Sequence, residues 1–169
     1  SPPHPRDRKR PGMELAQMKN VLALDLGSKC GWASMHNGSV LSGLFQYKPS
    51  RFDGGGVRFV KFETSLNNLL DVRTPQIVFF ERVHRHLGVA AAHCYAGYLA
   101  VLTATCEKRG IPYQGLSVQE IKIAATGKGN APKDLMVAAA KAVWKDQAVE
   151  TDDVADALWC MHAGLKLHK

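Results

Sequence analysis

The chain has 169 residues, 46% of them apolar, and a formal net charge of +7. This composition excludes a disordered protein and fits one domain with its own core. Residues 1–12, SPPHPRDRKRPG, hold a net charge of +3 and no apolar segment, which excludes a signal peptide or membrane anchor there. We expect residues 1–18 to form a basic, proline-rich arm or a tag remnant. The remaining positive excess is moderate and compatible with binding a polyanion.

The cysteines indicate a reducing compartment. None of the four forms a CxxC pair, so reduced thiols in the cytoplasm are expected. The same lack of paired cysteines, and of an HExxH motif, disfavours a zinc site.

The first half of the chain predicts mainly strands. Residues 21–27, VLALDLG, form an apolar run that ends in Asp25 and a glycine, which is typical of a buried strand. In the next segment, apolar and polar residues alternate on both sides of Asn37-Gly38, the dipeptide best suited to a type I′ hairpin turn. Helical spacing follows over residues 57–70. QIVFFE, residues 76–81, predicts a second buried strand that again ends in an acid.

The second half predicts mainly helices. Residues 87–108 indicate a long helix closed by a glycine, and residues 111–115 a further strand. Ser117 and Glu120 form a capping box for a short helix, and Pro132 suits the first turn of another that continues to Trp144. A last helix begins near residue 151. The order predicts an α/β domain in which helices flank a mixed five-stranded sheet.

The start of the last helix, TDDVADALWC, has three carboxylates in five positions. Acidic side chains are favoured in the first turn of a helix, so capping and catalysis are both open on this stretch alone. Asp153 and Asp156 lie about 60° apart on the helix and could share one ligand. Neighbouring carboxylates repel each other unless a proton or cation lies between them, which favours a divalent metal if more acids converge.

Two further acids stand at the ends of predicted strands. Asp25 and Glu81 each end an apolar run, and ligands usually collect beyond the carboxyl ends of parallel strands. Each acid alone could be an exposed strand end or pair with a neighbour such as Arg82. A buried carboxylate without a partner costs desolvation energy, so the acids together predict a shared cation.

The sequence resembles the RuvC family of Holliday junction resolvases from about residue 21 onward. Four segments occur in the family's order: LALDLGSKCGWA, VFFERV, IPYQGLSVQEIKIAATGKGNAPKDLMVAAAKAV and DDVADAL. The resemblance implies an RNase H-like fold and a RuvC-like nuclease domain over residues 19–169. It implies a metal-dependent endonuclease that resolves four-way DNA junctions by paired symmetric nicks, in DNA recombination and repair.

The resemblance also implies roles for individual residues. The catalytic acids and metal ligands would be Asp25, Glu81, Asp153 and Asp156, with Asp152 as a capping or outer carboxylate. Mg²⁺, for which Mn²⁺ could substitute, would act as two ions per site, leaving a 5′-phosphate and a 3′-hydroxyl. Lys122 and Lys133 match basic positions near the cut, where they would neutralise transition-state charge or anchor the backbone.

The side chains expected to bind DNA are five basic residues and one histidine: Lys122, Lys128, Lys133, Arg82, His84 and Arg85. The stretch ERVHRHLG departs from the family, whose members often carry an aromatic residue soon after the second-strand glutamate. His84, Arg85 and His86 could stack on bases or contact phosphate instead, or form a solvated loop.

Three alternatives remain open. A nucleotide-binding ATPase of the actin and sugar-kinase type also has a loop like LDLGSKCG, but it needs two such domains, so no nucleotide cofactor is expected. A catalytically idle nucleic-acid-binding module would not need all four acids. Another RNase H-like nuclease could act on flaps, branched DNA or RNA–DNA hybrids.

Residues 87–106 contain no charged side chain. A helix of this length could span a bilayer, but its glycines, threonines and many alanines make it too weakly apolar, so no membrane is expected. One of its faces can pack on the sheet, and the other is covered either by the short C-terminal helices or by a second copy of the chain. We expect a homodimer through this helix, located in the cytoplasm of a bacterial or virus-infected cell.

Overall fold

The structure, a computed structural model, describes residues 18–85 and 88–168. Its sheet contains β1 (Val21–Asp25), β2 (Lys29–His36), β3 (Ser39–Gln46), β4 (Ile77–Arg82) and β5 (Tyr113–Ser117), in the order β3-β2-β1-β4-β5. Strand β2 runs antiparallel to both β1 and β3, whereas β1, β4 and β5 run parallel to one another. Asn37 and Gly38 both have positive φ, 50° and 83°, as a type I′ hairpin requires. The predicted mixed five-stranded sheet is confirmed.

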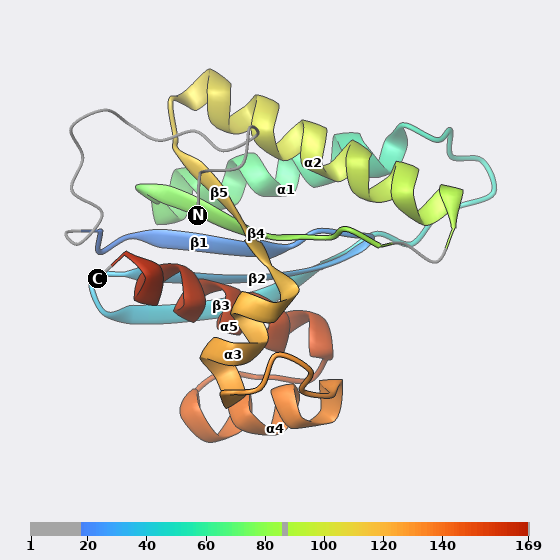
Figure 1. The fold of residues 1–169 in the computed structure, drawn as a ribbon. Helices are drawn as coiled ribbons and strands as arrows, with labels where there is room; N and C mark the ends of the chain where they lie inside the picture. Colours follow the sequence, from blue (N-terminus) through green and yellow to red (C-terminus); the bar gives the residue numbers. More distant parts are fainter. Residues whose placement is uncertain (1–17, 86–87, 169) are drawn as a thin grey trace.

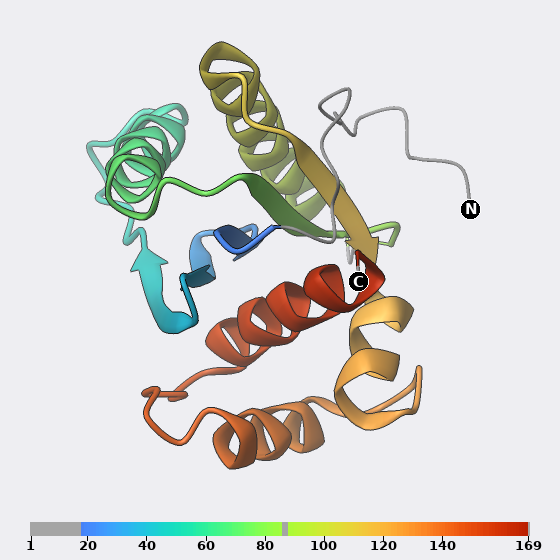
Figure 2. The same cartoon turned by 90° about the vertical axis from the view of Figure 1, so that its left-hand side faces the viewer.

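Helices cover both faces of this sheet. As Figures 1 and 2 show, α1 (Val57–Arg73) and α2 (Val89–Arg109) lie on one face and α5 (Asp152–Leu167) lies on the other. The shorter helices α3 (Val118–Thr126) and α4 (Lys133–Val143) pack on the outer side of α5. Helix α5 is therefore buried on nearly every side, which explains why its sequence is apolar far beyond one stripe.

Each face of the sheet has its own core. Alternate residues of a strand point to opposite faces, so Ala23 and Phe79 join the core under α5, while Leu24 and Phe80 join the core under α1 and α2. Met18, which the prediction assigned to the N-terminal arm, is buried in the α5 core. Residues 1–17, the rest of that arm, lie outside the described residues.

The boundaries of β5 differ from the prediction: the strand begins at Tyr113 and not at residue 111. Gly110 closes α2 in the left-handed conformation, and the Ile111 N–H donates to the carbonyl oxygen of Cys106 at 2.9 Å. Ile111 therefore completes the helix cap, and the strand begins only after Pro112. Pro132, expected in the first turn of α4, occupies its N-cap position.

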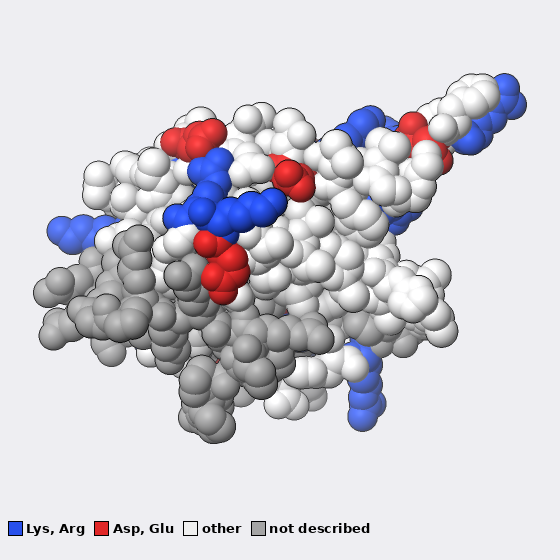
Figure 3. Space-filling model, turned by 90° about the horizontal axis from the view of Figure 1, so that it is seen from above, with Lys and Arg blue, Asp and Glu red and all other residues white. Residues whose placement is uncertain are grey.

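Helix α2 is, among the described residues, the one helix long and apolar enough to pass as a membrane span. It connects β4 to β5, which are paired in one sheet, and it packs on that sheet through Tyr98, Leu99 and Leu102. The alternative that C-terminal helices cover its outer side is wrong, because α3, α4 and α5 lie across the sheet. Figure 3 looks onto this side and shows an uncharged region between a cluster of charged side chains at one end and further Lys, Arg, Asp and Glu side chains toward the other.

Candidate active site

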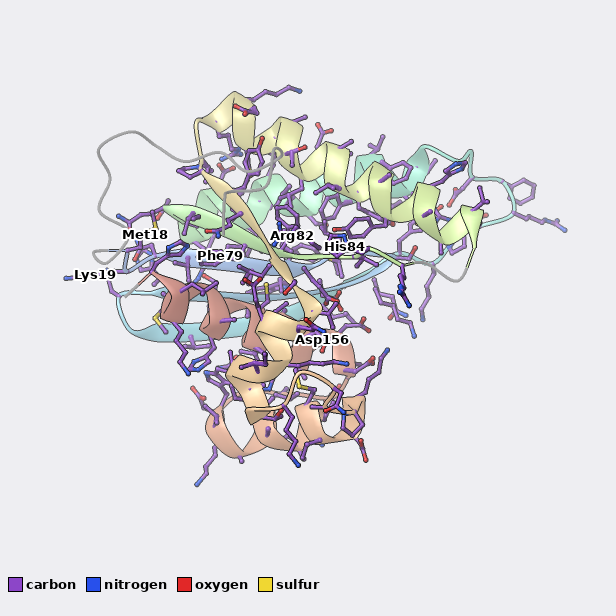
Figure 4. The ribbon with its side chains drawn as sticks, in the orientation of Figure 1. Met18, Lys19, Phe79, Arg82, His84 and Asp156 are labelled. Atoms are coloured by element: carbon purple, nitrogen blue, oxygen red, sulfur yellow. The ribbon has the colours of Figure 1, made fainter. Side chains whose placement is uncertain are left out.

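Three carboxylates meet at the carboxyl edge of the parallel strands. Asp25 ends β1, and Glu81 lies beside it on β4 because Leu24 and Phe80 are register partners. Asp156 approaches from the first turns of α5, as Figure 4 shows beneath the end of β4. One carboxylate oxygen of each residue lies within 4.8 Å of the others. The structure thus brings together acids that are 56 and 75 residues apart in the sequence.

Asp153 joins this cluster through a close approach of α5 to β2. Gly31 is the register partner of Asp25, and a Cβ at Gly31 would lie 2.0 Å from the carbonyl oxygen of Asp153. Since only glycine allows that approach, the first turn of α5 rests directly on the strand next to Asp25. The carboxyl groups of Asp25 and Asp153 are hydrogen-bonded to each other, and this contact adds to the rise in the pKa of Asp25 that burial causes.

The electrostatics of the cluster favour bound protons or a cation. Burial, followed by the charges of Asp156, Glu81 and Asp153, raises the pKa of Asp25 well above its usual range. Burial, followed by the charges of Glu81 and Asp152, raises the pKa of Asp156 to about 7. A divalent cation among these oxygens would remove the repulsion, and carboxylate oxygens are the donors that Mg²⁺ and Mn²⁺ prefer. The donor set therefore fits the expected metal.

Two lysines supply positive charge on one side of the cluster. Lys122 and Lys133 line a cavity of about 110 Å³ together with Glu81 and Asp156. Burial raises the pKa of Glu81, and these two lysines oppose that rise. The Lys133 ammonium also pairs with Asp152, 3.0 Å from its carboxylate oxygen, which lowers the pKa of Asp152.

Side-chain caps fix where α3 and α5 begin, and these helices carry Lys122 and the acids Asp153 and Asp156. The Ser117 hydroxyl accepts from the Glu120 N–H at 3.1 Å, and the Glu120 carboxylate accepts from the Ser117 N–H at 2.8 Å, which confirms the predicted capping box. The N-cap side chain of α5 is Thr151, whose hydroxyl accepts from the Val154 N–H at 3.4 Å. Because Thr151 supplies the cap, Asp153 can face Asp25 while Asp152 pairs with Lys133.

The other predicted DNA contacts lie apart from the acids. Arg82 alternates onto the α2 face of the sheet, where its side chain crosses Gly115 and approaches the Glu120 carboxylate at 3.9 Å. His84 and Arg85 are exposed beyond β4, and Lys128 is exposed in the loop between α3 and α4. His86 lies outside the described residues. Contact of these side chains with DNA remains a prediction.

Sequence reasoning missed two residues that position the site. The Tyr95 hydroxyl on α2 donates to the Glu81 carbonyl oxygen at 2.7 Å and accepts from the Val83 N–H at 3.3 Å, so it anchors the end of β4. No sequence signal points to that contact. Gly31, an isolated glycine inside a strand pattern, did carry a signal for close backbone approach.

Comparison with known proteins identifies the family. The family model described as crossover junction endodeoxyribonuclease RuvC matches residues 21–161. The RuvC protein of Pseudarthrobacter chlorophenolicus is 31% identical over 102 residues, which are 60% of this chain and 53% of that protein. The match thus spans about half the length of this curated relative.

Two solved structures have a similar fold. T. thermophilus RuvC in complex with Holliday junction substrate superposes with a TM-score of 0.74 at 17% identity, covering 87% of this chain and 92% of that one. The yeast mitochondrial Holliday junction resolvase Ydc2 superposes with a TM-score of 0.61 at 16% identity, covering 89% and 79%. The predicted RNase H-like fold is confirmed. The chain belongs to the RuvC family of crossover junction endodeoxyribonucleases.

Proposed function

We propose that this chain is a metal-dependent, structure-selective endonuclease that resolves four-way DNA junctions by paired symmetric nicks. The observation that carries the proposal is the convergence of Asp25, Glu81 and Asp156 within 4.8 Å, with Asp153 hydrogen-bonded to Asp25, in a chain of the RuvC family. One structural neighbour with the same fold is bound to a Holliday junction. We assign the catalytic role to these four carboxylates. We also propose that the protein acts in the cytoplasm.

The four carboxylates would hold Mg²⁺ or Mn²⁺, and we propose two ions per site. When bound, the ions supply an activated water and stabilise the charge on the leaving oxygen of the phosphodiester. The raised pKa values of Asp25 and Asp156 support this assignment, because a cation is what would let these buried acids ionise together.

The lysines have separate roles in this proposal. Lys122 lines the cavity beside Glu81 and Asp156, so its ammonium can approach the scissile phosphate and offset its growing negative charge. Lys133 is held by Asp152 at 3.0 Å, which orients its ammonium toward the same cavity. Asp152 thus acts as a positioning residue for Lys133.

We also propose that two copies pair through the uncovered side of α2. Ala96 and Ala100 are exposed there and, with Leu99, Thr103 and Tyr113, line a surface depression of about 370 Å³. A two-fold contact at this depression would present two identical acid clusters to two strands of one junction. Sedimentation equilibrium tests this: wild type should be a dimer at micromolar concentration and Ala100→Glu a monomer. A wild-type monomer that makes paired nicks without dimerising on DNA would refute it.

One substrate panel tests the activity. Labelled four-way junction, duplex, flap and RNA–DNA hybrid are incubated with the protein in Mg²⁺ or EDTA. We expect Mg²⁺-dependent cutting of the junction, its loss in Asp25→Asn and Glu81→Gln with junction binding retained or tightened, and a milder defect in Asp152→Asn. Preferred cutting of flaps or hybrids would identify another RNase H-like nuclease. Binding without any cutting would indicate an idle module.

A further inference from the structure

A second group of basic and aromatic side chains, the kinds that bind DNA, lies outside the acid cluster, in the segment that connects β3 to α1. Residues 47–61 contain four basic side chains and one acidic one, a net charge of +3, whereas residues 13–169 together have only +4. We call this group the β3–α1 patch: Tyr47, Lys48, Arg51, Phe52, Arg58 and Lys61. A positive excess concentrated in one short segment is typical of a polyanion contact.

The patch presents an aromatic ring to solvent. Phe52 is 82% exposed, the largest exposure among the large hydrophobic side chains that the structure describes. The Arg51 guanidinium lies over its ring, 4.8 Å from the centroid. Asp53 holds the loop in place, because its carboxylate accepts from the Tyr47 hydroxyl at 2.7 Å and from the Ser50 N–H at 3.1 Å. Phe52 therefore stands on a hydrogen-bonded loop and packs on no core.

The patch starts at the same end of the strands as the acids. Gln46, the last residue of β3, pairs with Lys29 of β2, and Gly31 of β2 pairs with Asp25. The Tyr47 N–H donates to the carbonyl oxygen of Ser28 at 2.9 Å. Strands are about 4.8 Å apart, so the start of the patch lies about 10 Å from β1, or about three base steps along a DNA strand.

A cavity links the patch to the turn that follows Asp25. It measures about 340 Å³, and its lining includes Gly27 and Ser28 of that turn together with Tyr47, Arg58 and Lys61 of the patch. The Arg58 guanidinium and the Lys61 ammonium both lie over the Tyr47 ring, 5.5 Å and 5.4 Å from its centroid. Two cations thus border a cavity whose lining begins at Gly27, two residues beyond the proposed catalytic acid Asp25.

We propose that the β3–α1 patch binds the DNA strand on the side of the acid cluster opposite Lys122 and Lys133, with Phe52 stacked on an unpaired base at the branch point. The inference rests on the proposed function. Since β3 and β5 form opposite edges of the sheet, and α3 with Lys122 follows β5, the patch and these lysines flank the acids from two sides. Lys48, Arg58 and Lys61 contact phosphates, and Lys48 and Lys61 are exposed.

The chemistry of the patch favours a single strand over a duplex. Basic side chains interleaved with exposed aromatic rings bind single strands, because the cations follow the phosphates while bases stack on the rings. The stretch after Glu81, RVHRH, contains no Phe, Tyr or Trp that could stack there. Phe52 supplies an aromatic ring on a different loop of the same sheet edge.

Two measurements test the proposal with four-way junction DNA that carries 2-aminopurine at the branch point. Binding is measured in Ca²⁺, where fluorescence reports stacking of the probe, and the dependence of Kd on salt is measured in parallel. Phe52→Ala should remove the fluorescence change and weaken junction binding by about 5- to 150-fold, the range expected when one base–aromatic stack is removed, whereas Phe52→Trp should retain both. Lys48→Ala/Lys61→Ala should reduce the salt slope by about one unit for each phosphate that the variant no longer binds.

Matched controls come from the opposite end of the strands, away from the acids. Val72 is 75% exposed near the end of α1, and Lys108 is exposed near the end of α2, so Val72→Ala and Lys108→Ala should leave both readouts unchanged. Thermal unfolding checks that each variant folds.

The outcomes separate this proposal from the proposed function. A wild-type protein that cuts the junction, with Phe52→Ala and the double lysine variant equal to it in fluorescence, Kd and salt slope, would overturn the patch alone. A wild-type protein that neither prefers nor cuts the junction would overturn the proposed function and the branch-point role with it.

Discussion

Replacing Asp156 by asparagine should stabilise the metal-free protein at neutral and higher pH. The folded protein keeps the Asp156 proton up to a pKa of about 7, because the side chain is buried beside Glu81 and Asp152. The unfolded chain releases that proton near pH 4. The folded state thus binds more protons than the unfolded state between these values, and the free energy of unfolding falls as pH rises through this window. The asparagine side chain of the variant is neutral at every pH, so the variant does not undergo this fall in unfolding free energy.

The size of the effect follows from the shift. The pKa rises from 3.8 to about 7, and each unit is worth about 1.4 kcal/mol, so ionising Asp156 costs the folded apoprotein about 4 kcal/mol. Between pH 4 and pH 8, the unfolding free energy of wild type in EDTA should fall by about this much more than that of Asp156→Asn. Mg²⁺ should restore the unfolding free energy of wild type at pH 8 and have little effect on that of the variant.

Urea unfolding in EDTA, repeated from pH 4 to pH 8, measures the difference. Asp152→Asn is the matched control with the opposite sign. Lys133 lowers the pKa of Asp152, so this carboxylate stabilises the fold above its unfolded pKa, and its loss should destabilise the protein at pH 8 but not at low pH. An Asp156→Asn variant that is less stable than wild type at pH 8, or equally shifted at every pH, would refute the reasoning.

Three further predictions concern the residues that hold the site in place. Gly31→Ala should lower activity about 100-fold and weaken Mg²⁺ binding by calorimetry, because its Cβ would lie 2.0 Å from backbone of Asp153 and force α5 away by about 1 Å. Gly27→Ala, whose Cβ meets nothing closer than 3.8 Å, should bind Mg²⁺ normally, and equal affinities would contradict the packing argument. Tyr95→Phe removes the 2.7 Å bond to the Glu81 carbonyl and should lower turnover more than junction affinity; an unchanged turnover would exclude a positioning role. Lys133→Ala should flatten the salt dependence of junction binding by about one unit of log slope, and an unchanged slope would place this lysine off the DNA.

Local patterns in the sequence were sufficient for much of the fold. The Asn37-Gly38 turn, the Ser117 capping box and the two apolar runs that end in Asp25 and Glu81 each reflect short-range chemistry, and all appear in the structure. Parallel pairing of those two strands then places both acids at one edge of the sheet, which the prediction also anticipated.

Contacts between distant segments could not be predicted in the same way. The approach of Asp153 to Asp25 depends on how closely α5 packs on Gly31, and periodicity within one helix contains no such information. The pairing of Lys133 with Asp152 and the anchoring of Glu81 by Tyr95 likewise require the assembled fold. The placement of Arg82 away from the acids did have a signal, because consecutive strand residues alternate between faces.

The central claim, that four carboxylates form the catalytic metal centre, is tested most directly by anomalous diffraction at the manganese edge from crystals soaked in Mn²⁺. The account predicts peaks among the carboxylate oxygens of Asp25, Glu81, Asp153 and Asp156, and their loss in crystals of Asp25→Asn. Ordered manganese bound elsewhere, with none at these carboxylates in a protein that cuts DNA in Mn²⁺, would contradict it.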